Sequence, residues 1–243
     1  MPSLRKGGRY DNVSRSYHCA GALLRSVMRL VTKKDWHGAE NLPKEGGFLA
    51  VSNHVTYADP LTFAHYLYNN GVPPRFLAKA SLFSTPIVGR IMRALDQVPV
   101  HRGTTKAKEA VEDGVEFLAR GDCIAIFPEG TLTRDPDLWP MVARTGAARM
   151  ALVTGVPVIP VAQWGAQRLI GRYKKSIHPF PRKTVSIVAG PPINLDDLRG
   201  KPLTNDLLRA ATDRIMTTLT RMVEELRGEK APAKPYDMRK QGT

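Results

Sequence analysis

The amino-acid sequence predicts an α/β domain with a mostly parallel central sheet, and three features of the chain support this fold. Short apolar runs of strand length alternate with segments of helical periodicity over residues 46–228. The composition is that of an ordinary globular domain, with 42% apolar and 24% charged residues in 243 positions. No internal repeat interrupts the alternation. We therefore expect a single domain whose sheet is flanked by helices.

The N-terminal segment, residues 1–45, is expected to lie outside this domain as a flexible basic stretch followed by an amphipathic helix. Residues 1–34 carry eight Lys or Arg and one acid. Such a basic amphipathic helix indicates either a membrane-surface element or ordinary packing on the domain. Its apolar stripe consists of Ala20, Leu23, Leu24, Val27, Met28 and Val31. In the membrane interpretation the contacts are Leu23, Leu24, Arg25, Val27, Met28 and Arg29.

Capping residues and apolar runs delimit the remaining elements. Asp59-Pro60 is expected to open a helix, because Asp is a favoured N-cap and Pro is favoured in the first turn. Gly71 and Gly121 are expected to end helices. The predicted strands are 48–52, 75–80, 97–101, 123–128, 157–163 and 184–190, and the predicted helices are 59–70, 86–95, 104–120, 146–154 and 203–227. Residues 229–243 are expected to form a flexible tail.

The charge of the chain predicts an anionic partner. The formal net charge is +14, which suits nucleic acid, an anionic membrane or a phosphorylated substrate. Few aromatic residues and no groove-reading motif argue against nucleic acid. Two cysteines cannot build a disulfide framework, and no spanning helix or signal peptide is predicted. We expect a cytoplasmic location.

Asn53-His54-x4-Asp59 lies where the first strand of the domain is predicted to end. Functional groups of open α/β sheets gather at such carboxyl ends. The spacing lets Asp59 contact one imidazole nitrogen of His54, which leaves the other nitrogen as a base for a hydroxyl proton. The alternative is that Asp59 only caps the helix and His54 is an ordinary loop histidine.

Two further clusters follow predicted strands, and a third block lies within one. Arg102 in Val98-Pro-Val-His-Arg102 is either a phosphate ligand or a surface arginine. Phe127-Pro-Glu-Gly-Thr131 is either a substrate-binding turn or a plain turn with Glu129 in solvent. Val156-Pro-Val-Ile-Pro160 holds no titratable group and is expected to be structural or to line an apolar pocket. The acid-free segment 165–183 is either a solvated loop or a second anion-facing surface.

In order and spacing these four blocks resemble the glycerolipid acyltransferases, the PlsC-like superfamily of glycerol-3-phosphate and 1-acylglycerol-3-phosphate acyltransferases. The resemblance covers residues 45–195 and includes Lys79-Ala-Ser-Leu-Phe83. The extension from Thr131 to Trp139 is similar to actinobacterial members. The resemblance implies acyl transfer from acyl-CoA or acyl carrier protein to a lysophospholipid acceptor at the cytoplasmic face of a membrane, as a peripheral protein without metal or other cofactor.

The resemblance also implies roles for individual residues. His54 is the implied general base and Asp59 the carboxylate that orients it. The implied acceptor and phosphate ligands are Lys79, Arg102, Glu129, Gly130 and Thr131. Family members often carry Arg after Glu-Gly-Thr, where this chain has Leu132, so Arg134 and Arg144 are further candidates for the phosphate site. A different lipid or glycolipid acceptor is the first alternative, and a non-enzymatic basic binding module is the second.

Overall fold

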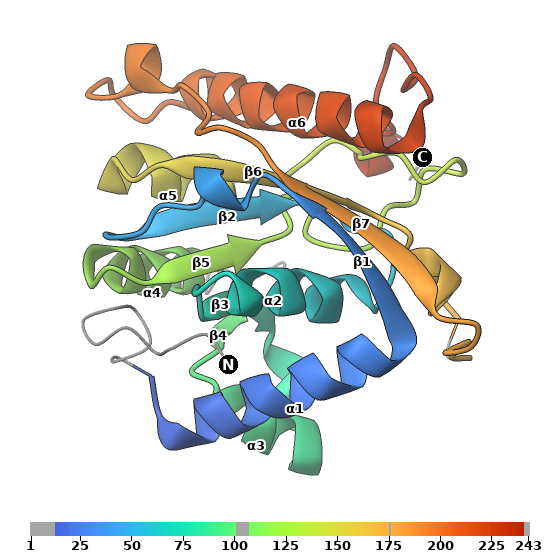
Figure 1. The fold of residues 1–243 in the computed structure, drawn as a ribbon. Helices are drawn as coiled ribbons and strands as arrows, with labels where there is room; N and C mark the ends of the chain where they lie inside the picture. Colours follow the sequence, from blue (N-terminus) through green and yellow to red (C-terminus); the bar gives the residue numbers. More distant parts are fainter. Residues whose placement is uncertain (1–12, 101–106, 175, 241–243) are drawn as a thin grey trace.

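A seven-stranded sheet forms the centre of the computed structural model, which describes residues 13–100, 107–174 and 176–240, with only the backbone for 107–110 (Figure 1). Its strand order is β1-β7-β6-β2-β5-β3-β4. Every neighbouring pair is parallel except β6 and β7, which are antiparallel. The strands are β1 Thr32–His37, β2 Phe48–Ser52, β3 Pro74–Lys79, β4 Val98–Val100, β5 Cys123–Ile126, β6 Val158–Trp164 and β7 Lys183–Ala189. The predicted fold class is confirmed.

Helices cover both faces of the sheet, and the alternation of β2 side chains shows how. Leu49 and Val51 face a core shared with α4, α5 and α6, whereas Phe48 and Ala50 face a core shared with α2. Helix α1 packs outside α2, and α3 lies at the same end of the molecule (Figure 1). The helices are α1 Arg15–Val31, α2 Asp59–Asn69, α3 Pro86–Ala94, α4 Ala107–Ala119, α5 Gly146–Thr154 and α6 Asn205–Arg227.

The sheet begins earlier in the chain than predicted. Residues Thr32–His37, for which no strand is expected, form the edge strand β1 and pair in parallel with β7. The boundary at residue 46 is therefore wrong, because the domain contains β1. An edge strand exposes much of its surface and needs no continuous apolar run. The charged sequence of β1 therefore gives no strand signal.

The C-terminal segment is docked on the domain, so the expectation of a frayed tail is wrong for residues 229–240. The Ala231 N–H donates to Glu224, and the Val142 N–H donates to the Tyr236 carbonyl at 2.9 Å. Just before it, the Arg227 guanidinium lies over the rings of Trp139 and Trp164, 3.7 and 4.4 Å from their centroids. The two hydrogen bonds are made by a carboxylate and by backbone groups, so an apolar sequence pattern could not predict them.

Helix α1 divides the predicted apolar stripe into two faces. Met28 is 2% exposed and packs with Ala58 and Leu169, so its assignment to a membrane interface is wrong. Leu23, at 66% exposure, Val27 and Leu30 instead point outward. Ser14 caps the helix, accepting from the Tyr17 N–H. In the part of the chain that the structure describes, no helix has both the length and the apolar character to cross a bilayer.

Candidate active site

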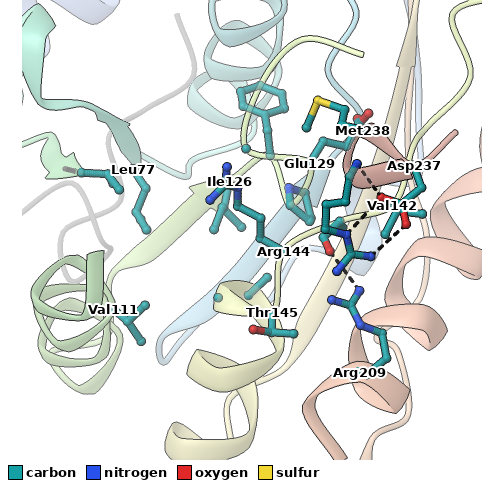
Figure 2. A pocket seen from close by; sticks show the side chains of 18 residues that line it. Leu77, Val111, Ile126, Glu129, Val142, Arg144, Thr145, Arg209, Asp237 and Met238 are labelled. Carbon is teal, nitrogen blue, oxygen red and sulfur yellow. Dashed lines mark hydrogen bonds and ion pairs between the residues drawn. The ribbon is translucent and has the colours of Figure 1, made fainter. Parts of the chain in front are cut away.

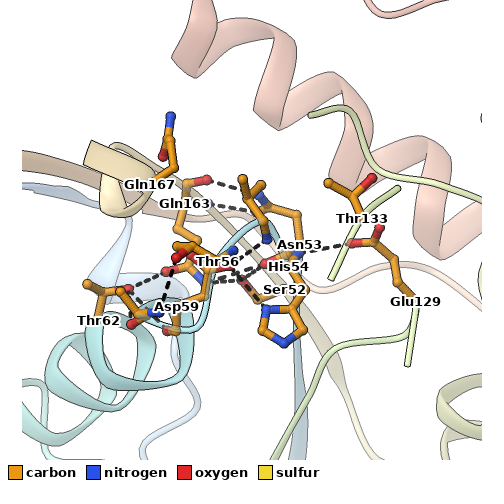
Figure 3. Close-up of polar contacts among 12 residues, drawn as sticks. Ser52, Asn53, His54, Thr56, Asp59, Thr62, Glu129, Thr133, Gln163 and Gln167 are labelled. Atoms are coloured by element: carbon orange, nitrogen blue, oxygen red, sulfur yellow. Dashed lines mark hydrogen bonds and ion pairs between the residues drawn. The ribbon is translucent and has the colours of Figure 1, made fainter. Parts of the chain in front are cut away.

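His54 and Asp59 meet in the loop between β2 and α2 (Figure 3). The His54 Nδ1 atom lies 3.1 Å from Asp59 Oδ2. The same oxygen accepts the backbone N–H groups of Val55 and Thr56 at 2.5 and 2.7 Å. Ala58, not Asp59, is the N-cap residue of α2, so the expectation that Asp59 caps the helix is wrong. Asp59 instead holds the loop that carries the imidazole.

This geometry selects one state of the imidazole. An ionised carboxylate only accepts hydrogen bonds, so the proton of neutral His54 lies on Nδ1 and Nε2 presents its lone pair. The Phe127 ring stacks on the imidazole with 4.0 Å between ring centroids and an interplanar angle of 18°. The imidazole is thereby held on one edge and one face, and Nε2 has no hydrogen bond within the described residues. Such a histidine is arranged to accept a proton.

Glu129 fastens the third sequence block to the first. It is 0% exposed, and its carboxylate oxygens accept the His54 N–H at 2.9 Å and the Met141 N–H at 3.1 Å. Burial raises the pKa of Glu129 to about 8, with Asp59 and Asp135 adding to the rise and the two N–H groups opposing it. The alternative that Glu129 stands in solvent is wrong. Its carboxylate fixes the backbone at His54.

A buried amide pair ties the fourth block to the same loop (Figure 3). The Asn53 Nδ2 group donates to the Gln163 carbonyl at 3.0 Å, and the Gln163 N–H donates to Asn53 Oδ1 at 2.9 Å. The Gln163 side chain also accepts from the Thr62 hydroxyl at 2.6 Å. Sequence reasoning overlooked Gln163. The signal that could have found it is an amide at the end of the apolar run of β6, a position where a buried polar group needs partners.

A cavity of about 540 Å³ adjoins this loop, and we call it the Arg144 pocket (Figure 2). Phe127 lines this pocket and also stacks on His54, so only the Phe127 ring separates the pocket from the imidazole. Its lining has two parts. One is apolar and comes from β3, β4, α4 and β5, with Leu77, Val100, Val111 and Ile126. The other is basic, with Arg144, Arg209 and Arg239.

Comparison with known proteins gives the family of this chain. The acyltransferase family model matches residues 33–164. The chain belongs to the acyltransferase family. One relative from this family, the 1-acyl-sn-glycerol-3-phosphate acyltransferase of Borreliella burgdorferi, is 34% identical over 125 residues, which are 51% of this chain and 48% of the relative. The chain thus spans about half the length of the first curated relatives that it matches.

Two family members match over more of their length. The 1-acyl-sn-glycerol-3-phosphate acyltransferase of Bacillus subtilis is 24% identical over 86% of this chain and 94% of its own. The crystal structure of the 1-acyl-sn-glycerophosphate acyltransferase PlsC from Thermotoga maritima superposes with a TM-score of 0.65 and 26% identity, covering 90% of this chain and 86% of that one. The likeness therefore extends over nearly the whole acyltransferase domain.

The residues that the family resemblance implies for acceptor binding fall into three groups. Glu129, Gly130 and Arg144 line the Arg144 pocket. Gly130 has a φ of 73°, and a Cβ there would lie 3.0 Å from the Arg144 side chain, so this position needs glycine. Three do not line the pocket: Lys79 at the exposed end of β3, Thr131, and Arg134 on the exposed side of the following loop. Arg102 lies outside the described residues.

Part of the acid-free segment 165–183 serves the site's scaffold. Arg172 donates to the carbonyls of Thr133 and Asp135, and the Tyr173 hydroxyl donates to the Thr133 carbonyl at 3.3 Å. Thr133 in turn donates its N–H to the His54 carbonyl at 2.7 Å. Neither alternative therefore describes Arg172 and Tyr173, which are not in a purely solvated loop and do not form a free anion-binding surface. They hold in place the loop that contacts the His54 carbonyl.

Proposed function

We propose that the protein transfers a fatty acyl group from an acyl thioester, acyl-CoA or acyl carrier protein, to the free hydroxyl of 1-acylglycerol-3-phosphate. The observation that carries this proposal is the His54–Asp59 pair, one ring away from a pocket with an apolar part and an arginine part. A lysophospholipid has the same two parts, an acyl chain and an anionic headgroup. The names of the family members above point to the same acceptor.

The chemistry needs one base and close alignment of two substrates. His54 Nε2 takes the proton of the acceptor hydroxyl as its oxygen attacks the thioester carbonyl. The imidazolium then gives this proton to the departing thiolate as the tetrahedral intermediate collapses. Asp59 stabilises the imidazolium and keeps Nε2 directed at the reacting oxygen. Glu129 supports both steps through the His54 backbone.

We propose that the enzyme works at an anionic membrane surface, which it contacts through α1. Leu23, Val27 and Leu30 form an exposed apolar stripe, and Arg29 on the same helix is also exposed. The expectation that Arg25 contacts the membrane is wrong, because its guanidinium lies over the Tyr68 ring of α2, 5.1 Å from the ring centroid. Residues 13–34 contain no acid, so the helix is complementary to anionic lipid. Each basic residue near such a surface contributes about 1 kcal/mol.

Helix α3 extends this surface. Ile87, Val88 and Ile91 are exposed, and residues 74–95 also contain no acid. The two helices adjoin, since the Ser14 hydroxyl at the start of α1 donates to the Ala94 carbonyl at the end of α3. Exposed apolar side chains on two adjoining helices are typical of an interaction site.

The activity is tested by measuring free thiol released from acyl-CoA, or from acyl carrier protein, in the presence of 1-acylglycerol-3-phosphate. A panel containing other lysophospholipids and glycolipids identifies the preferred acceptor. This panel matters because the buried Leu132 leaves no cation directly after Glu-Gly-Thr. We expect thiol release to depend on the phosphorylated acceptor. Equal release without any acceptor would contradict acyl transfer.

Membrane contact is tested by flotation with vesicles that contain anionic phospholipid. We expect binding to weaken as salt is raised, and Leu23→Glu with Val27→Glu to abolish it while the domain stays folded. Leu203→Glu is the matched control, since Leu203 is also exposed but precedes α6 at the opposite end of the molecule. If the double variant floats as the parent does, α1 is only a packing helix.

A further inference from the structure

Three arginines from three separate elements gather at the rim of the Arg144 pocket. Arg144 belongs to the loop before α5, Arg209 to α6, and Arg239 to the docked C-terminal segment (Figure 2 shows the first two). Neither the sequence blocks nor the family resemblance draws attention to Arg209 or Arg239. Arg144 is exposed and has no ion pair within the described residues. The rim therefore carries more positive charge than the acidic side chains beside it neutralise.

Hydrogen bonds to the backbone of three consecutive residues hold these elements together. The Val142 N–H donates to the Tyr236 carbonyl at 2.9 Å, which docks the C-terminal segment. The next residue, Ala143, accepts from Arg209 Nη1 at 3.0 Å, which docks α6. The Arg144 N–H then donates to the Pro128 carbonyl at 2.9 Å, which docks the third sequence block. Residues 142–144 thus place all three arginines around the Arg144 pocket.

Acids at the rim only partly neutralise it. Asp237 accepts from Arg239 at 3.0 and 3.1 Å, and it also accepts the Arg239 backbone N–H at 3.0 Å. The Arg239 side chain is 68% exposed and that of Asp237 14%, so the pair stands at the mouth of the pocket. Arg209 lies 3.8 Å from Asp213, a loose contact on its own helix. Glu129 is buried and already bonded to two backbone groups.

We propose that Arg209 and Arg239 complete, together with Arg144, a subsite for the phosphate of the acceptor, and that Asp237 competes with this phosphate for Arg239. The inference rests on the proposed function, because it assigns the pocket to a phosphorylated acceptor. A phosphate monoester carries up to two negative charges and several acceptor oxygens, which guanidinium groups bind with paired hydrogen bonds. The C-terminal segment is then part of the substrate site, and Asp237 is a built-in competitor.

The test uses variants with opposite expected signs in the full-length protein. Arg209→Gln and Arg239→Gln should each raise the KM for 1-acylglycerol-3-phosphate about three- to fivefold, as expected for charge contacts in a partly exposed site. Asp237→Asn should lower this KM, because it frees Arg239 while its side-chain oxygen still accepts the Arg239 N–H. Arg221→Gln is the matched control, since Arg221 is exposed on α6 but does not line the Arg144 pocket.

Binding of sn-glycerol 3-phosphate, measured by calorimetry, provides a readout that needs no turnover. We expect Arg239→Gln to weaken it and Asp237→Asn to strengthen it. Loss of this binding in Arg239→Gln supports the subsite even if the parent protein shows no acyl transfer, in which case only the proposed function fails. The subsite is contradicted if Asp237→Asn and Arg239→Gln both raise the KM, which would indicate a merely structural segment. A rise confined to the KM of the acyl donor would also contradict it.

Discussion

His54 and His65 lie eleven positions apart, one before α2 and one inside it, and their surroundings differ in the one respect that matters for proton transfer. His54 has a carboxylate 3.1 Å from Nδ1 and a pocket close by. His65 is buried against the edge of Trp36, with 4.9 Å between ring centroids. Its Nε2 atom has no partner within the described residues. Burial lowers the pKa of His65 to about 3, and nearby Lys34, Arg29 and Arg25 add to this effect.

The difference teaches that burial alone does not make a catalytic imidazole. A buried histidine without an acidic partner stays neutral and cannot hold a proton during a reaction. His54 has Asp59 to stabilise its protonated form and an unoccupied nitrogen to accept a proton. The same side chain is thus a core residue in one place, and in the other it has the surroundings that a base requires.

The largest effect is expected from His54→Ala. Removal of the base should lower the rate of acyl transfer about 10³-fold, within the usual contribution of general-base catalysis. Thiol release by the purified variant measures this loss, and circular dichroism checks that the domain is folded. His65→Leu is the matched histidine control. Near-parental turnover in folded His54→Ala would remove the basis for the proposed mechanism.

Asp59→Asn is expected to lower the rate about 10²-fold, somewhat less than loss of the base itself. Asn retains an oxygen that can accept the backbone N–H groups of Val55 and Thr56, but it carries no charge to stabilise the imidazolium. Chemical denaturation and the split between kcat and KM separate this role from folding, since kcat should fall while the KM for the acceptor and the folded fraction stay near their parental values. A loss of activity that follows the loss of folded protein would show that Asp59 acts only on loop structure.

Glu129 variants are expected to affect stability as well as rate. Glu129→Ala leaves two buried N–H groups without partners, at a cost of about 1–3 kcal/mol each, and should lower kcat about tenfold. Glu129→Gln keeps one acceptor oxygen and should be milder. The folded-state pKa of about 8 lies above the ordinary value of 4.5, so the folded protein holds a proton that the unfolded chain has lost. The free energy of unfolding should therefore fall as the pH rises from 4.5 to 8 and level off above 8. Chemical denaturation between pH 5 and 9 should show this slope in the parent and not in Glu129→Gln.

The smallest effect on activity is expected from His65→Leu, which should instead alter stability in acid. The pKa of His65 is depressed from 6.5 to about 3, so the unfolded chain binds a proton that the folded chain does not. The ratio of folded to unfolded protein should therefore fall up to about tenfold per pH unit as the pH drops from 6.5 towards 3. His65→Leu should remove this dependence, whereas His37→Leu, at an exposed site, should keep it.

Local patterns alone determined the fold class and the contact between His54 and Asp59. The sheet strands β2, β5 and β6 are continuous apolar runs because both of their faces are buried, so a single sequence reveals them. His54 and Asp59 are five residues apart, and a single turn of chain brings them together. Their spacing was enough to predict the contact.

Only the tertiary structure decided the groups that hold and complete this site. Glu129 meets the His54 backbone across 75 residues of chain, and Gln163 meets Asn53 across 110. Arg144, Arg209 and Arg239 converge because a loop, a helix and a terminal segment share hydrogen bonds at three consecutive residues. Met28 and Leu23 have the same apolar character in the sequence, but α2 covers only one side of α1. Such pairings depend on how elements pack, and packing is not encoded within any one segment.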